Sequence, residues 1–296
     1  MTSPPAPLRY RGDGLAPGGA APASRGEAGR YIPDPQLVAA VNTALIVEQP
    51  LLVTGEPGTG KTALAWSVAT ELGIGDVLDF HTRSDHQARD ALYEMDNLLR
   101  FYHAQIHDER ATKPEQYVRW NALGEAIRSP ARRLVLIDEI DKAPRDFPND
   151  LLDEIDQMEF RVPELGEKFR AAHRPVVIIT SNSERQLPDP FLRRCVFHRI
   201  EFPSADLLQA ILSQRLGHLG LSDKLVAAAV KRFEEVRALP GLEKKPATGE
   251  LLAWVKVLGA TKVEVGALEN LALGELPSPG ALLKTEQDAR LLRSAG

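Results

Sequence analysis

The sequence predicts an α/β fold in which helices cover both faces of a parallel sheet, followed by a small domain made only of helices. Short, continuously apolar runs alternate with helical patterns over the first two thirds of the chain. This alternation is typical of parallel strands that are buried on both faces. The last third shows helical patterns only, divided by glycine and proline.

The chain opens with residues 1–30, which are crowded with Pro, Gly, Ala and Ser and lack apolar periodicity. We therefore expect a disordered leader there. A helical pattern starts at Tyr31 and places Leu37, Val41 and Leu45 on one face, until Pro50 ends it. The apolar run that follows, residues 51–54, is expected to form a buried strand.

Further apolar runs predict the remaining strands of the sheet. They are residues 76–80, 134–138, 176–181 and, with a weaker pattern, 197–202. Because helical patterns separate these runs, we expect a single α/β domain over residues 31–203.

The pattern changes after Pro203. Helices are predicted over residues 207–216, 225–239 and 251–258, within a helical lid domain of residues 204–275. Residues 276–296 contain two prolines and a glycine before a short possible helix, and we expect a C-terminal tail there.

Composition limits the classes of function. The chain has 296 residues, a net charge of −5 and a pI near 5.9, which argues against a broadly basic surface for nucleic acid. It lacks an apolar run of about eighteen residues and a basic segment followed by an apolar one, so we expect a cytoplasmic protein without a membrane span. Its only cysteine, Cys195, cannot form an internal disulfide and is expected to be a packing residue.

Residues 55–62 match the phosphate-loop pattern G-x-x-x-x-G-K-[ST], with a predicted strand before them and a predicted helix after them. Backbone N–H groups of such a loop point at phosphate oxygens at the start of a helix. Lys61 is expected to reach the β- and γ-phosphates, and Thr62 to bind Mg²⁺ through its hydroxyl. The residues predicted to bind ATP here are Gly55, Glu56, Pro57, Gly58, Thr59, Gly60, Lys61 and Thr62.

Two carboxylates, Asp138 and Glu139, follow directly on the apolar run at residues 134–137. Ligands of open parallel sheets collect at the carboxyl ends of the strands. Asp138 is predicted to hold the Mg²⁺ shell, and Glu139 to orient and activate the attacking water. In isolation an acidic strand end that faces solvent explains the pair equally well, but the phosphate loop favours a site for ATP and Mg²⁺.

These residues belong to a longer series of motifs. Residues 134–142, 180–182 and 187–194 resemble, in chain order, the Walker B, sensor 1 and arginine-finger elements of AAA+ ATPases. The resemblance covers roughly residues 31–260 and adds the P-loop NTPase core to the expected fold. The sequence TRSDHQARDALY at residues 82–93 looks most like the MoxR branch. That branch implies an insertion at about residues 92–127 and a hairpin over residues 158–174.

The resemblance also implies roles for three polar residues. Asn182 is expected to help position the attacking water, unless it is only a polar strand end. Arg193 and Arg194 are placed at a subunit edge, where one of them, by preference Arg194, reaches a neighbour's nucleotide; a solvated basic pair is the alternative. Such a finger requires a neighbour, so we expect a homo-oligomer in the form of a hexameric ring.

One departure from the AAA+ pattern concerns the lid. Residues 244–254 correspond to the segment that carries the sensor 2 arginine, and the expected arginine is Gly249. Either Lys244 or Lys245 replaces it, or the lid is coupled more weakly to the nucleotide.

The expected function is ATP-driven remodelling of a partner protein. By analogy with the MoxR branch, the partner is a von Willebrand factor A domain protein or a metalloenzyme awaiting activation. A slow nucleotide-gated scaffold and a subunit of a nucleic-acid motor are the alternatives; Gly249 favours the scaffold, whereas Glu139 and Asn182 oppose it.

Overall fold

A computed structural model describes residues 8–17 and 31–295, which form two compact units. The first is an α/β unit that contains the described residues up to Gly55 together with Lys61–Ile200. The second is a helical unit that contains Glu56–Gly60 and the described part of Glu201–Gly296. The phosphate-loop segment Glu56–Gly60 therefore groups with the helices, although its two ends belong to the α/β unit.

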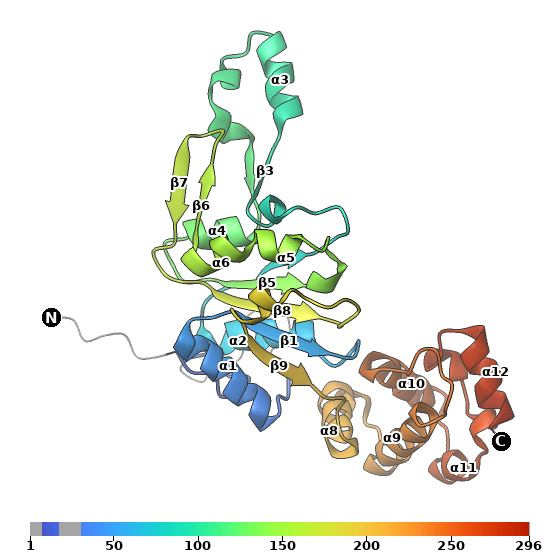
Figure 1. The fold of residues 1–296 in the computed structure, drawn as a ribbon. Helices are drawn as coiled ribbons and strands as arrows, with labels where there is room; N and C mark the ends of the chain where they lie inside the picture. The colour runs from blue at the N-terminus through green and yellow to red at the C-terminus, as the bar shows by residue number, and fades with distance from the viewer. Residues whose placement is uncertain (1–7, 18–30, 296) are drawn as a thin grey trace. The chain divides into compact units, whose positions relative to one another are not determined.

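The α/β unit is built on a five-stranded parallel sheet with the order β2-β5-β8-β1-β9 (Figure 1). The strands are β1 (Leu51–Gly55), β2 (Leu78–His81), β5 (Leu134–Asp138), β8 (Val176–Ser181) and β9 (Val196–Ile200). All five fall within or next to the predicted apolar runs, and the predicted fold class is confirmed.

Successive residues of the central strands enter two different cores. On β1, Leu51 and Val53 pack with α1 (Pro35–Val47) and α2 (Lys61–Leu72), whereas Leu52 packs on the opposite face. Short helices cover that second face (Figure 1): α4 (Ala122–Arg128), α5 (Phe147–Asp150), α6 (Leu152–Gln157) and α7 (Asp189–Leu192). Burial on both faces explains why the strands are apolar without alternation.

Part of the expected disordered leader is packed against α2. The Tyr10 side chain is fully buried and its hydroxyl lies 2.9 Å from the Ser67 hydroxyl. The Glu71 carboxylate accepts hydrogen bonds of 2.8–3.0 Å from the backbone N–H groups of Arg11, Gly12 and Gly14. The prediction of disorder is therefore wrong for residues 8–17, because a segment held by one aromatic ring and by backbone donors shows no periodicity. Residues 1–7 and 18–30 lie outside the described residues.

Most of the segment expected as an insertion, residues 92–127, forms an arm after β2, but its last residues, 122–127, belong to α4 on the sheet. The arm contains β3 (Tyr93–Met95), α3 (Asn97–Gln105) and β4 (Val118–Trp120), with β3 and β4 antiparallel. Short 3-10 helices complete it: η2 (Ala88–Ala91), η3 (Glu109–Thr112) and η4 (Pro114–Tyr117). A second hairpin, β6 (Glu159–Val162) with β7 (Glu167–Arg170), lies where the hairpin before sensor 1 is expected.

The helical unit has its own core, which includes the fully buried Trp254 and Phe233. Its helices are α8 (Ala205–Leu216), η6 (Gly217–Leu219), α9 (Asp223–Arg237), α10 (Thr248–Ala260), α11 (Val265–Asn270), η7 (Leu273–Glu275), η8 (Pro279–Ala281) and α12 (Glu286–Ser294). The expected C-terminal tail is part of this unit, because Leu276, Leu282 and Leu292 are buried in the same core. A tail was predicted because Pro277 and Pro279 interrupt the periodicity, although these prolines only turn the chain between packed segments.

The single cysteine packs against the core that α4, α5 and α6 cover, as expected for a structural residue. Burial raises the pKa of the Cys195 thiol to about 12, so the thiol is protonated at neutral pH.

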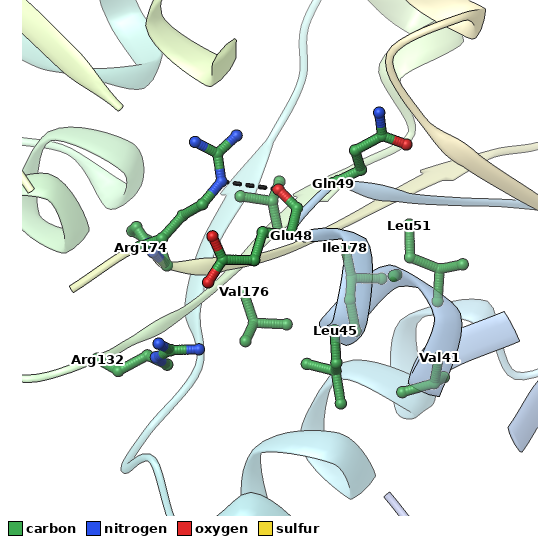
Figure 2. A pocket seen from close by; sticks show the side chains of 12 residues that line it. Val41, Leu45, Glu48, Gln49, Leu51, Arg132, Arg174, Val176 and Ile178 are labelled. Carbon is green, nitrogen blue, oxygen red and sulfur yellow. Dashed lines mark hydrogen bonds between the residues drawn. The ribbon is translucent and has the colours of Figure 1, made fainter. Parts of the chain in front are cut away.

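A pocket of about 390 Å³, part of it open to solvent, lies at the amino-terminal ends of the central strands (Figure 2). Its apolar wall includes Leu51 and Val176, the first residues of β1 and β8. Arg174 lies at its rim and donates from Nε to the Glu48 carbonyl oxygen over 2.7 Å. The phosphate loop follows the other end of β1, so this pocket is not the nucleotide site.

No helix among the described residues is long and apolar enough to cross a membrane.

Asp288 on α12 is a buried carboxylate that accepts hydrogen bonds from the backbone N–H groups of Glu243 (2.8 Å) and Lys244 (3.2 Å). Burial alone would raise the pKa of Asp288, but these bonds and one from Thr285 hold it below its usual value. We expect Asp288→Asn to lower the free energy of unfolding by about 1–3 kcal/mol, as measured by urea denaturation at pH 7.

The control is Glu269→Gln, which removes an exposed carboxylate from α11 of the same unit. Because the folded-state pKa of Asp288 is depressed, its stabilisation exists above the ordinary carboxyl pKa and is lost as the pH falls through the folded value. The difference between Asp288→Asn and the parent should therefore shrink in acid. Equal unfolding free energies at pH 7 would contradict this role.

Candidate active site

The phosphate loop connects the end of β1 to the start of α2. Gly58 and Gly60 have φ angles of 77° and 89°, a region in which other residues are strained, and they let the backbone turn back on itself. Lys61 is only 6% exposed, and its ammonium donates to the Gly55 carbonyl oxygen over 2.8 Å. The cation therefore lies across the loop, where phosphate oxygens would be bound.

Thr62 and Asp138 come together from α2 and β5. The Thr62 hydroxyl lies 3.1 and 3.2 Å from the two carboxylate oxygens of Asp138. A hydroxyl and a carboxylate are hard oxygen ligands, and Mg²⁺ in nucleotide sites takes few protein ligands beside phosphate oxygens and waters. These donors fit Mg²⁺. The described residues contain no cluster of three or more His, Cys, Asp or Glu side chains that would form an all-protein metal site.

Glu139 adopts a left-handed backbone conformation, with φ 56° and ψ 49°. Hydrogen bonds from neighbouring strands hold this conformation. Its N–H donates to the Thr180 hydroxyl over 2.9 Å, and the Thr82 hydroxyl donates to the carbonyl oxygens of Glu139 and Asp138. The strand end is therefore turned so that the Glu139 side chain leaves the sheet beside Asp138.

The Glu139 carboxylate is held between an amide and an ammonium. Asn182 Nδ2 donates to Oε1 over 3.1 Å, and Lys142 Nζ donates to Oε2 over 2.5 Å. The hydrogen bond with Glu139 raises the pKa of Lys142, which therefore remains charged. Lys142 therefore competes with any other hydrogen-bond donor, an attacking water included, for this carboxylate oxygen.

Asp141 positions the sensor residue. Its carboxylate is 2% exposed and accepts hydrogen bonds from the backbone N–H groups of Asn182 (3.2 Å) and Glu184 (3.0 Å). The start of the loop after β8 is thus tied to the loop after β5. This contact orients Asn182 toward Glu139.

Several residues of this site were missed by the sequence analysis. Thr180 donates to Asp138 from the adjacent strand β8, Thr82 follows β2, and His81 Nδ1 lies 3.3 Å from the other Asp138 oxygen. The available signal was their position at the ends of apolar runs, because the carboxyl ends of parallel strands meet at one edge. Strand order, which decides which ends are neighbours, could not be predicted.

The arginine pair lies away from these residues. Arg193 and Arg194 follow α7 and precede β9, so they lie toward the amino ends of the strands, whereas the site residues follow the carboxyl ends. Arg194 donates to the Asp156 carboxylate and, over 3.0 Å, to the Pro190 carbonyl oxygen. The Arg193 side chain is exposed and has no hydrogen-bond or ion-pair partner among the described residues.

The expected substitutes for the sensor 2 arginine do not contact the loop. Gly249 is exposed in the first turn of α10, and a Cβ there would meet nothing within 4 Å. Lys244 and Lys245 are exposed, and within the part of the chain that is described no hydrogen bond or ion pair joins them to Glu56–Gly60. Arg237 does contact the loop: its Nη2 lies 2.8 Å from Glu56 Oε2.

Comparison with known proteins identifies the family of the chain. Residues 51–204, just over half of the chain, match the ATPase family associated with various cellular activities (AAA). No curated protein matches the chain. Among solved structures, a point variant of RuvB from Thermotoga maritima aligns with a TM-score of 0.49 and 16% identity over 79% of this chain. The alignment covers 65% of that protein, so this chain spans less than two thirds of its length. On the family match, whose range contains the phosphate loop and the Asp138–Glu139 strand end, the chain belongs to the AAA family of ATPases.

Proposed function

We propose that this chain binds Mg²⁺ and ATP at the phosphate loop and hydrolyses ATP to ADP and phosphate. The observation that carries the proposal is the position of the Glu139 carboxylate. It follows Asp138, which contacts Thr62 of the phosphate loop, and it accepts a hydrogen bond from Asn182. A base, a metal ligand and a phosphate-binding lysine thus meet at one edge of the sheet.

Each residue has a role that its chemistry supports. The Lys61 ammonium offsets phosphate charge, and Thr62 with Asp138 holds the metal. Bound Mg²⁺ would neutralise charge on the phosphate oxygens. Glu139 orients a water molecule and accepts its proton, while Asn182 fixes the direction of the Glu139 carboxylate and of that water. These roles depend on placement and electrostatics, as is usual for phosphoryl transfer.

We further propose a hexameric ring of the MoxR type that remodels a partner protein in the cytoplasm. The support for this type is the arm between β3 and β4 together with the β6–β7 hairpin before β8. The support for a ring is the location of Arg193 and Arg194 toward the strand ends opposite the phosphate loop, from which an arginine can reach a second copy. A von Willebrand factor A domain protein or an immature metalloenzyme is the partner class that this branch suggests.

The contact between Lys142 and Glu139 favours one alternative, a slow nucleotide-gated scaffold. In the structure described here the catalytic carboxylate is engaged by an ammonium at 2.5 Å. A protein that kept this pair would bind nucleotide and assemble, but it would turn over slowly until a partner displaced Lys142.

The specific ATPase rate should rise with protein concentration and should exceed the GTPase rate. The reason is that an arginine acting on a neighbour's nucleotide contributes only after assembly. The measurement is phosphate release across a dilution series with Mg²⁺, with sedimentation to record assembly. A negligible rate that does not change with concentration would favour the scaffold.

Lys61→Ala should abolish ATP binding, whereas Glu139→Gln should bind ATP with parent affinity and lower kcat by about 10²–10⁴. Only the second substitution leaves the phosphate contacts intact and removes the base. Nucleotide titration and single-turnover kinetics separate these effects, and Glu115→Gln, at an exposed carboxylate, is the control. Parent turnover in Glu139→Gln would show that another group activates the water.

Arg194→Ala should slow hydrolysis by about 10³ without changing ATP affinity. Mixing it with Lys61→Ala should restore part of the activity, because an intact finger would then act on an intact phosphate loop. Since Arg194 must leave Asp156 to reach a neighbour, Arg193→Ala is the matched comparison. If only Arg193→Ala is slow and is rescued by mixing, Arg193 is the finger and Arg194 holds α7 in place.

A further inference from the structure

The middle of the phosphate loop, Glu56–Gly60, belongs to the helical unit and contacts two of its residues, Arg237 and Ala247. Arg237, at the end of α9, reaches Glu56, the second residue of the loop, with 2.8 Å between Nη2 and Oε2. A Cβ on Gly58 would lie 2.5 Å from the Ala247 Cβ, which leaves room only for glycine. Ala247 is the residue before α10. The loop is thus fitted closely to the start of that helix.

Arg237 is held on several sides by residues of the same unit. Its guanidinium lies over the Phe202 ring, with 3.4 Å between the guanidinium carbon and the ring centroid. Nη1 donates to the Pro246 carbonyl oxygen, next to Ala247. The Arg237 side chain is 12% exposed. A guanidinium is planar, so it can stack on the Phe202 ring and donate hydrogen bonds from its edges at the same time. A lysine ammonium cannot make this combination of contacts.

The charge of Glu56 explains why an arginine is needed. A carboxylate in a loop that binds phosphates repels the anion and weakens its binding unless a cation offsets it. Thr59 also ties this residue into the loop, since its hydroxyl donates to the Glu56 carbonyl oxygen over 2.9 Å. Arg237 therefore neutralises Glu56 and joins the loop to Pro246 at the same time.

We propose that Arg237 is a positioning residue for the phosphate loop, which it holds in its phosphate-binding form through Glu56 and links to the start of α10. This inference rests on the proposed nucleotide binding at the loop. It supplies a connection that Gly249, Lys244 and Lys245 do not make. The Arg237 guanidinium contacts Glu56 of the loop, whereas Lys61 is the residue proposed to contact the phosphates.

The test is the affinity for fluorescent ADP, measured by titration of four proteins: the parent, Arg237→Ala, Glu56→Gln and the double variant. Arg237→Ala should raise the Kd about tenfold, because it removes the cation that lies beside the Glu56 carboxylate. Glu56→Gln alone should change the Kd by less than about threefold. The double variant should bind better than Arg237→Ala, since the repulsion is then removed.

Arg232→Ala is the matched control for a loss of helix stability. Arg232 lies on the same helix α9, is 8% exposed, and bonds to Glu235 and to the Leu271 carbonyl oxygen rather than to the loop. It should lower the melting temperature and leave the Kd unchanged. If Arg237→Ala does not fold, Arg237→Lys tests the same contact. It should raise the Kd, because an ammonium cannot donate to both Glu56 and the Pro246 carbonyl oxygen while it also stacks on Phe202.

Steady-state kinetics gives a second readout. Arg237→Ala should raise KM for ATP more than it lowers kcat, since Arg237 acts on the loop and does not touch the reacting atoms. A folded Arg237→Ala protein with parent Kd, or a double variant that binds no better than Arg237→Ala, would overturn the inference while leaving the proposed function intact. A parent protein that does not bind ADP would overturn both.

Discussion

The parallel hydrogen bonding of β8 between β1 and β5 is the constraint on which the candidate site depends. It aligns the carboxyl ends of the three strands, so that the phosphate loop, Asp138 and Thr180 lie at one edge of the sheet. The register places Ile137 beside Ile179, and the next pair along the strands is Asp138 and Thr180, which are hydrogen-bonded. Apolar packing on both faces holds this register, because a shift by one residue would turn every side chain to the opposite face.

Polar residues at this edge are constrained by one another. Glu139 has a left-handed backbone conformation, which costs about 1–3 kcal/mol for a residue other than glycine. Hydrogen bonds with Thr180 and Thr82 offset this cost, and Asn182 with Lys142 orients the carboxylate. The arrangement places the Glu139 carboxylate beside Asp138 and holds it through hydrogen bonds from Lys142 and Asn182.

The phosphate loop is the other constrained element. Its ends belong to the α/β unit, and its middle residues Glu56–Gly60 belong to the helical unit. Within the helical unit, Arg237 of α9 forms an ion pair with Glu56 of the loop. Arg237 thus gives this loop a contact with α9 that Gly249 does not provide.

The sequence by itself determined the fold class, the strands of the main sheet and the phosphate-loop motif, because buried parallel strands are continuously apolar and a phosphate loop needs glycine, lysine and threonine at set offsets. It could not place Tyr10, Asp141, Thr180 or Arg237, since these act through contacts between segments that are distant along the chain. The ordered segment at residues 8–17 and the packing of residues 276–295 were missed for a similar reason: irregular segments bind through single side chains and backbone donors, which leave no period in the sequence. Only the tertiary structure decided which strand ends are neighbours and which arginine reaches the loop, because strand order and helix packing bring together residues up to 181 positions apart.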